Sequence, residues 1–502
     1  METIIEAPAG RAGFGPVLRA EWTKFRTVRG WVIGMALAPL VTVGLGHLVS
    51  SGMVCSQAGH PCSVPLGPGG EPVTDSFYLV HRPLAARGSI TVRVTALTGG
   101  GQASGGLQPW SKAGIIVTAS TRVGAAYAAM MVTGDHGVRM QDDYTQDVAG
   151  LPGAVGPLSP RWLRLTRSGD TVTGYDSADG SHWSRVGTAQ LAGLPATVQA
   201  GLFAASPPAV DAGPARHATA ATPAIVTVDH VAAAGTRPGG AWAGIRIGAA
   251  SGPALAGPGS FRESGGTFTV SGSGDIAPAV SGQDGGAPVA WTLAGGFAGL
   301  IAMAVVASMF VTAEYRHRLI RTTLAASPRR GQVLAAKAIV IGAVGFAAGL
   351  AGAAVAVPLG ERALREHGNF IAGVTAPTEM RVVLGTAALF AVTAVLALAL
   401  GTVLQDSTGA VTAVVAGIVL PYLLAAALPV LPAAAADWLL RVTPAAGFAI
   451  QGTSVQYPQV SATYLPFFGY YPLAPWAGFA VLCAWTAAAL ALAAFLLRHR
   501  DV

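Results

Sequence analysis

The sequence predicts a membrane protein of six α-helices that carries an all-β sandwich between its first and second helix. Long apolar segments, almost free of charge, recur along the 502 residues, and the first two are separated by about 240 residues of strand-like sequence. Composition agrees, because 52% of the residues are hydrophobic and only 11% are charged. Such a mixture suits packed membrane helices combined with turn-rich β-structure.

The apolar segments have the length of membrane spans. The first, 31–50, contains about 20 residues without a formal charge, enough to cross ~30 Å of hydrocarbon at 1.5 Å per residue. Five more apolar segments, rich in Gly and Ala, follow at 289–312, 333–358, 383–404, 409–431 and 474–497. We therefore expect six membrane-spanning helices.

The net charge of +7 is unevenly distributed. Residues 51–289 hold 14 Lys or Arg and 14 Asp or Glu, so the whole excess lies in the helical part. The basic residues gather before the first span, between the second and third, and after the last: Arg11, Arg19, Lys24, Arg26, Arg29, Arg316, Arg318, Arg321, Arg329, Arg330, Arg498 and Arg500. The positive-inside rule then predicts a multi-pass plasma-membrane protein with both termini and the 313–332 loop cytoplasmic, and residues 51–288 extracellular. Since topology explains the basic residues, no nucleic-acid partner is expected.

Two cysteines fall just outside the first span. An oxidising exterior would allow Cys55 and Cys62 to close a small disulfide loop, and the alternative is two free thiols. Val54 does not suit the small residue that a lipoprotein cleavage site requires before the cysteine, so we expect the first span to remain as an anchor.

The stretch between the first two spans has the pattern of a β-sandwich. Between about 77 and 231, runs rich in Val, Ile, Thr and aromatic residues alternate with turn residues every 8 to 15 positions. The pairs Gly169-Asp170 and Asp179-Gly180 are expected to separate three strands of a meander. From 232 to 288 the composition shifts to Gly, Ala, Pro and Ser, which predicts a flexible tether with one hairpin in 261–278.

Three segments of the insert resemble a known fold family. PWSKAGIIVTAS (109–120), PRWLRLTRSGDTVTGYDSADGSHWSRVG (160–187) and LPATVQAGLFAASP (194–207) are similar to the concanavalin A-like jelly-roll family related to laminin-G and glucanase folds. The resemblance covers about 150 residues and implies a jelly roll of a kind that often binds carbohydrate, although a fold does not fix a function.

Catalysis and metal binding find little support in the insert. Retaining glucanases of this fold place carboxylates at alternate positions of one strand, whereas Glu71 and Glu263, the glutamates of 51–288, are isolated. Asp142, Asp143 and Asp147 could offer oxygen ligands to calcium, but a solvated acidic loop is the preferred interpretation. We therefore predict a non-catalytic accessory domain, with no catalytic, cofactor-binding or metal site.

Three tryptophans could contact an extracellular ligand. Trp110, Trp162 and Trp183 could stack on a sugar ring of cell-wall glycan, although packing in the core of the sandwich is the more common role.

The predicted cytoplasmic segments resemble a transporter family. LRAEWTKFRTVRG (18–30) places Leu18, Trp22 and Phe25 at i, i+4 and i+7, as in an amphipathic interfacial helix. With FVTAEYRHRLIRTTLAASPRRGQVLAAKAIV (310–340) and ADWLLRVTPAAGF (436–448), it resembles the permease subunits of type-2 ATP-binding-cassette (ABC) exporters of the actinobacterial kind. The resemblance covers 18–50 and 289–502. The inserted β-domain departs from it, because ordinary members have only a short first external loop.

The resemblance implies a partner ATPase and a second permease, either the same chain or a paralogue. Contacts to the ATPase would come from Trp22, Lys24, Arg26, Glu314, Arg316, Arg318, Arg321, Thr322 and Thr323. The chain contains no Gly-x-x-x-x-Gly-Lys-Ser/Thr loop, so ATP would be bound by the partner and this chain would carry no cofactor.

Coupling to an ion gradient is not expected, because the predicted spans lack ionisable residues apart from Lys337. Two alternatives stay open. The arginines could merely satisfy topology and meet anionic lipid in the bilayer, or the protein could be a non-transporting receptor or sensor whose sandwich binds cell-wall glycan or a protein.

Overall fold

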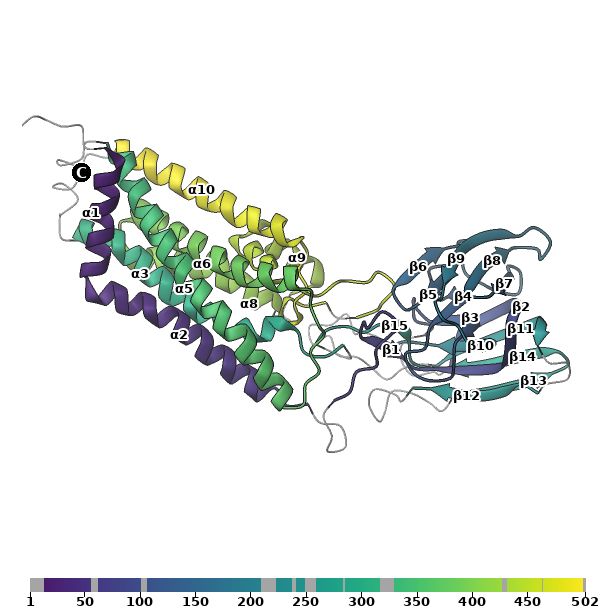
Figure 1. The fold of residues 1–502 in the computed structure, drawn as a ribbon. Coiled ribbons are helices and arrows are strands. Elements are labelled where there is room, and N and C mark those ends of the chain that lie inside the picture. Colours follow the sequence, from purple (N-terminus) through teal and green to yellow (C-terminus); the bar gives the residue numbers. More distant parts are fainter. Residues whose placement is uncertain are drawn as a thin grey trace, which may run out of the picture. The chain divides into compact units, whose positions relative to one another are not determined.

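The computed structural model describes residues 13–55, 62–100, 106–208, 223–236, 241–248, 259–282, 285–316, 329–426, 431–462 and 464–499. The chain divides into two compact units. The helical unit comprises Met1–Cys62, Ala287–Ser454 and Tyr464–Val502, and the β-unit comprises Ser63–Gly286 and Val455–Thr463. Figure 1 shows helices in the first and strands in the second.

The helical unit confirms six helices that are long and apolar enough to cross a membrane. They are Arg29–Gly52, Val289–Arg316, Arg330–Glu366, Ala376–Leu404, Ser407–Ala425 and Pro475–His499. The elements are α1 (Phe14–Thr27), α2 (Arg29–Gly52), η1 (Val289–Leu293), α3 (Gly296–Arg316), α5 (Arg330–Glu366), α6 (Ala376–Leu404), α7 (Ser407–Val414), η2 (Val415–Val419), α8 (Leu420–Ala426), α9 (Ala433–Val442), η3 (Pro444–Gln451), η4 (Pro466–Phe468) and α10 (Pro475–His499). These six helices indicate a membrane-embedded protein.

Small residues let the helices of this unit approach closely. A Cβ added to Gly349 of α5 would lie 2.7 Å from the Cβ of Phe390 on α6, and one added to Gly46 of α2 would lie 2.3 Å from the backbone oxygen of Thr292. Glycine at these positions therefore sets the helix spacing, as is common in membrane helices. Larger side chains pack where α2 and α3 lie next to α1, and there the rings of Trp31 and Phe310 meet edge to face 5.1 Å apart.

The β-unit contains fifteen strands within its described residues. They are β1 (Val73–Asp75), β2 (Phe77–Gly99), β3 (Lys112–Thr118), β4 (Tyr127–Thr133), β5 (Val138–Asp142), β6 (Gln146–Ala149), β7 (Arg161–Ser168), β8 (Thr171–Ser177), β9 (Ser184–Gln190), β10 (Thr197–Ala205), β11 (Ala224–Thr236), β12 (Ala243–Ile247), β13 (Ser260–Ser264), β14 (Thr267–Gly272) and β15 (Ile276–Pro278). All the paired strands are antiparallel.

The long strand β2 organises the β-unit. One path runs β13-β14-β11-β2-β10-β3-β4-β5-β6, while β12 and β7 also pair with β2, and β8 and β9 continue from β7. The first half of β2 pairs with β10, placing Val80 opposite Leu202, and its second half pairs with β7, placing Val92 opposite Leu163. The sheet therefore folds over on itself at β2. One buried hydrophobic cluster lies between its layers and includes Ile115 of β3, Met130 of β4, Leu163 of β7 and Val172 of β8.

The described parts of 232–288 form more strand structure than the expected tether, and residues 237–240, 249–258 and 283–284 lie outside the described residues. The expected hairpin is present as β13 and β14, but β12 also pairs with β2 and β15 pairs with β1. Ile247 and Ile276 are buried at 3% and 0% exposure, so both short strands are parts of the hydrophobic core. Isolated apolar residues in Gly-rich sequence give little local signal, and their strand structure depends on partners far away in the chain.

A buried ion pair fixes the place where the chain enters and leaves the β-unit. Lys112 is 0% exposed, and its Nζ donates to Asp275 Oδ1 at 2.6 Å and to the carbonyl of Ile276 at 2.8 Å. Asp275 immediately precedes β15, which pairs with the entry strand β1. The first and last strands of the insert are thus held together, as a domain inserted between two helices requires.

The β-unit also includes a segment from much later in the chain, Val455–Thr463. Gln459 is 3% exposed, and its Nε2 donates to the carbonyl of Thr145 at 3.3 Å. The connection before the last span therefore contributes to the β-unit, an arrangement that the linear order of segments did not predict.

Candidate functional site

Helix α1 is amphipathic, but its buried face differs from the predicted one. Phe25 is buried at 4% exposure and Leu18 is partly buried, whereas Trp22 is 46% exposed. The third buried position is Glu21, at 5% exposure. Leu18, Glu21 and Phe25 follow i, i+3 and i+7, so the acidic side chain points toward the spans and the tryptophan points away.

Glu21 belongs to a buried cluster of opposite charges that joins three helices. Lys337 Nζ, on α5, donates to Glu21 Oε2 at 2.7 Å and to Glu314 Oε1, near the end of α3, at 2.5 Å. Lys24, one turn after Glu21 on α1, also forms an ion pair with Glu314. We call Glu21, Lys24, Glu314 and Lys337 the four-residue ion cluster.

Three members of the ion cluster are buried, Lys24 is half-buried, and the charges of the cluster balance. Lys337 and Glu314 are 2% and 1% exposed, and two carboxylates face two ammonium groups. The Lys337 ammonium also lies 4.9 Å from the ring centre of Phe310, within the range of a cation–π contact. Burial, followed by repulsion from Lys337, lowers the pKa of Lys24 to about 8.

Removing one member of such a cluster is costly, because it leaves a buried charge without its counterion. The cluster therefore fastens α1 to the ends of α3 and α5. Phe25 adds an apolar contact, since its ring lies 6.0 Å from that of Phe310, edge to face.

The predicted coupling residues fall into three groups in this arrangement. Trp22, Arg26 and Arg316 are exposed at the end of the helical unit that carries α1. Glu314 and Lys24 are members of the ion cluster, so Glu314 is buried and unavailable to an outside protein. Arg318, Arg321, Thr322 and Thr323 lie outside the described residues.

Lys337 is the one lysine, arginine or acidic residue of the predicted spans, and its partner Glu21 was not predicted. A signal was present, because Glu21 is four positions before Phe25 and shares its helix face. A lysine inside an apolar span requires a counterion, and the acidic residues nearest the ends of the spans were the available candidates.

At the other end of the spans, the structure joins Cys55 and Cys62 in a disulfide. The backbone N–H of Cys55 donates to His367 O at 3.1 Å, and that of Cys62 donates to Gly368 O at 3.0 Å. The disulfide loop is thereby attached to the chain that follows α5. Cys483 is a free thiol on α10.

The three candidate tryptophans differ in burial: Trp110 is one of the buried hydrophobic residues of the β-unit, whereas Trp162 and Trp183 are partly buried. Trp110 is 6% exposed and its ring stacks on the imidazole of His136, 3.8 Å away. Trp183 is half-buried, with the Arg164 guanidinium 3.8 Å from its ring centre. Their faces are thus already in contact with other side chains.

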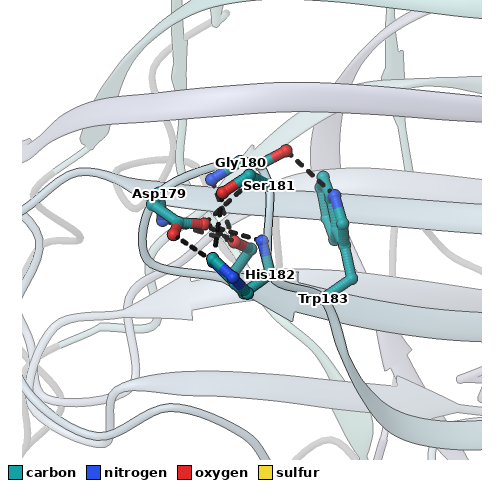
Figure 2. A network of polar contacts seen from close by, with 6 residues as sticks. Asp179, Gly180, Ser181, His182 and Trp183 are labelled. Atoms are coloured by element: carbon teal, nitrogen blue, oxygen red, sulfur yellow. Dashed lines mark hydrogen bonds and ion pairs between the residues drawn. The ribbon is translucent and has the colours of Figure 1, made fainter.

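Trp183 closes the turn between β8 and β9, which Figure 2 shows from close by, and the Trp162 ring packs against Gly180 of the same turn. Asp179 Oδ1 accepts hydrogen bonds from the backbone N–H groups of Ser181 and His182, both at 2.8 Å, and Trp183 Nε1 donates to Gly180 O at 3.0 Å. The His182 side chain, followed by these N–H groups, holds the pKa of Asp179 well below its usual range. The Asp-Gly-x-x-Trp pattern therefore builds a rigid turn.

The three aspartates of 142–147 have different environments. Asp147 pairs with Arg139, Asp143 accepts from the backbone N–H of Tyr127 at 3.2 Å, and burial raises the pKa of Asp142 to about 6. These aspartates are therefore paired, hydrogen-bonded or partly buried, whereas those of a solvated acidic loop would face water. No group of three or more His, Cys, Asp or Glu side chains suited to a metal ion occurs in the described part of the chain.

A small polar cavity lies beside Asp75 in the β-unit. Its volume of about 10 Å³ has room for one water molecule. Asp75 accepts from Tyr144 Oη at 2.9 Å and from the backbone N–H of Gly124 at 2.8 Å, and burial raises its pKa to about 6. The cavity is too small for a sugar ring.

Comparison with known proteins identifies no family. No protein-family model matches the chain, and no curated protein matches it. Among solved structures, a GH43 protein of Bacillus licheniformis is 20% identical over 24% of this chain and 24% of its own, with a TM-score of 0.18. A functionally unknown protein from Saccharomyces cerevisiae is 17% identical over 38% and 93% (TM-score 0.24), and scytalido-glutamic peptidase is 8% identical over 39% and 98% (TM-score 0.26). The alignment thus spans about a quarter of the length of the Bacillus licheniformis chain.

Proposed function

We propose that this chain is the membrane-spanning permease subunit of an ATP-driven exporter of the type-2 ABC kind. It would work with a separate ATPase and with a second permease subunit, either a copy of itself or a paralogue. In this arrangement both termini and α1 face the cytoplasm, and the β-unit lies outside the cell. The six apolar helices and the basic ends of the spans support this topology.

The observation that carries the proposal is the attachment of α1 by the four-residue ion cluster. An amphipathic helix that only rested on a membrane surface would need no buried acidic residue, since lipid contact requires apolar and basic side chains. Here Glu21 anchors α1 to Lys337 of α5, while Trp22 and Arg26 remain exposed. A helix fixed to the spans on one face and open on the other is suited to receive force from a cytoplasmic partner.

The mechanism follows from this connection. When two ATPases close on ATP, they move the exposed face of α1, and the ion cluster passes the movement to α3 and α5. Because packed helix interfaces have discrete arrangements rather than continuous ones, the two permeases would rock between inward and outward states. Substrate would be released at the side that carries the β-unit.

The β-unit would be an accessory domain of the concanavalin A-like jelly-roll type without catalytic function. Glu71 precedes β1, and Glu263 lies on the exposed strand β13, so the two glutamates do not share a strand. The rings of Trp110, Trp162 and Trp183 contact His136, Gly180 and Arg164. A glycan or protein ligand would therefore bind by its polar groups rather than by stacking on these rings.

The test uses the exposed face of α1. The double variant Trp22→Ala/Arg26→Glu should reduce co-purification of the ATPase at least tenfold while the permease still folds, because neither side chain belongs to the ion cluster. Charge reversal at Arg318 and Arg321 should act in the same way. Arg185→Glu, an exposed charge reversal on β9, is the matched control and should leave co-purification unchanged.

Unaltered ATPase binding and transport in both α1 and loop variants would contradict the proposal. The alternative, a membrane receptor or sensor that binds cell-wall glycan or protein through its β-unit, predicts that no ATPase co-purifies with the wild-type chain. It also predicts that deletion of the β-unit abolishes the response.

A further inference from the structure

A cavity rich in arginine lies where α5 begins and α10 ends. It has a volume of about 700 Å³ and is lined by Arg329, Arg330, Gly331, Gln332, Ala494 and Arg498. Its polar lining consists of three guanidinium groups and one side-chain amide. The cavity belongs to the helical unit and is distinct from the four-residue ion cluster.

The cavity lies at the ends of two candidate spans. Arg330 is the first residue of α5, and Arg498 lies in the last turn of α10. Headgroups occupy this depth in a bilayer, just outside the hydrocarbon. Arg330 Nη1 donates to the carbonyl of Leu497 at 2.5 Å, which ties the two helix ends together and orients the guanidinium.

Exposed apolar side chains continue from the cavity along both helices. Leu492 and Phe495 of α10 are 48% and 56% exposed, and Ile339 of α5 is 49% exposed. Ile339 follows Gln332 by seven residues and therefore lies on the same face of α5. A ligand with an anionic head and an apolar chain fits this combination, whereas a free phosphate would use the arginines alone.

We propose that this cavity binds the phosphate headgroup of an anionic phospholipid, with Arg329 and Arg498 as its main charge partners. Arginine suits the role, because its planar fork offers two parallel N–H donors to phosphate oxygens. The acyl chains lie against Leu492, Phe495 and Ile339. The inference is independent of the exporter proposal, since it requires neither an ATPase nor a transported substrate.

The experiment is native mass spectrometry of the purified full chain, titrated with phosphatidylglycerol, with phosphatidylcholine and with inorganic phosphate. Wild-type protein should bind phosphatidylglycerol in preference to phosphatidylcholine. The double variant Arg329→Gln/Arg498→Gln should weaken phosphatidylglycerol binding about 25-fold. Each basic residue near the membrane surface contributes a factor of about five in affinity, and the variant removes two of them. Arg19→Gln/Arg29→Gln removes the same charge from exposed residues at this end of the helical unit and should weaken it less than twofold.

A second variant separates lipid binding from folding. A Cβ added to Gly331 meets open space, and an acidic residue is favourable in the first turn of a helix. Gly331→Glu should therefore keep the thermal stability of wild type while repelling the anionic headgroup, with at least a tenfold loss of phosphatidylglycerol binding.

Three outcomes would overturn the inference. The pocket variants could bind phosphatidylglycerol as wild type does, or the Arg19/Arg29 control could lose as much binding as the pocket variant. Inorganic phosphate could also bind with the same dependence on Arg329 and Arg498 and without preference for phosphatidylglycerol over phosphatidylcholine, which would identify a free phosphate site.

Discussion

Lys337 shows how a single residue can determine the packing of a membrane helix bundle. It lies in the apolar segment of α5, where an isolated charge would be strongly unfavourable. Its two carboxylate partners come from α1 and α3, more than 300 residues and 23 residues away along the chain. One lysine thereby fixes the position of two other helices.

Removal of this charge should release α1. Lys337→Met leaves Glu21 and Glu314 buried with Lys24 as their remaining cation, and we expect the free energy of unfolding of the helical unit to fall by about 3 kcal/mol or more. Hydrogen exchange should accelerate first in α1. Arg362→Met is the matched control on the same helix, because Arg362 forms an exposed pair with Glu366 and exposed ion pairs contribute little to stability. Equal effects of the two variants would show that the ion cluster does not hold α1.

Asp75 should make the β-unit less stable as the pH rises. Its folded-state pKa is raised to about 6, mainly by burial, while the unfolded chain titrates near its ordinary value. The folded state therefore binds the proton more tightly, and this stabilisation is fully present below about pH 4 and is lost as the pH rises through 6.

Asp75→Asn should flatten this dependence and raise the free energy of unfolding at pH 8 by about 1 to 3 kcal/mol. Urea titration of the full chain, followed by hydrogen exchange in β3 and β4, measures the effect at pH 5 and pH 8. Some slope will remain, because burial raises the pKa of Asp142 to about 6 as well. A variant with the same pH slope as wild type would exclude Asp75 as its source.

At the scale of elements, the two hairpin turns of the β7-β8-β9 meander provide a matched pair. Gly169 and Gly180 both have positive φ, at 65° and 80°. A Cβ at Gly169 would meet open space, whereas one at Gly180 would lie 2.7 Å from the Trp162 ring. The two glycines thus share a positive φ, but only Gly180 packs against another side chain.

Gly180→Ala should therefore destabilise the β-unit more than Gly169→Ala. The positive φ should cost each variant about 1 kcal/mol, and displacement of the indole should add about 1 to 3 kcal/mol to Gly180→Ala. Urea midpoints of the β-unit, compared between the two variants, give the difference directly. Equal losses of stability in the two variants would mean that the Trp162 ring moves aside without cost and does not fix the turn.

At the scale of the whole molecule, the charge distribution makes a topological prediction. Leu158 is fully exposed in the β-unit, at 101%, and Arg19 is exposed on α1. Leu158→Cys should react with a membrane-impermeant maleimide in intact cells, whereas Arg19→Cys should react only after permeabilisation. The wild-type chain is the control, because Cys55 and Cys62 are bonded and Cys483 lies within a span. Labelling of Arg19→Cys in intact cells would contradict the proposed topology, because it would place α1 outside the cell.

Local pattern was sufficient for most elements of this protein. Each apolar segment found in the sequence coincides with a candidate span, because length and composition alone decide whether a helix can cross hydrocarbon. The Gly169-Asp170 and Asp179-Gly180 pairs likewise mark the turns between β7, β8 and β9, because turn chemistry is local. Strand β12 and the pairing of β15 with β1 were not predicted, since single apolar residues such as Ile247 and Ile276 acquire a strand partner only in the folded chain.

The sequence by itself determined the six apolar helices, the β-rich insert and the net positive charge of the helical part. Each follows from quantities that are summed along the chain, such as hydropathy, periodicity and charge. The tertiary structure alone decided that Glu21 meets Lys337, that Glu314 is buried, and that Arg329 and Arg498 line one cavity. These pairings join residues far apart in the chain, and the energy of a buried charge depends on which counterion packing brings within hydrogen-bonding distance.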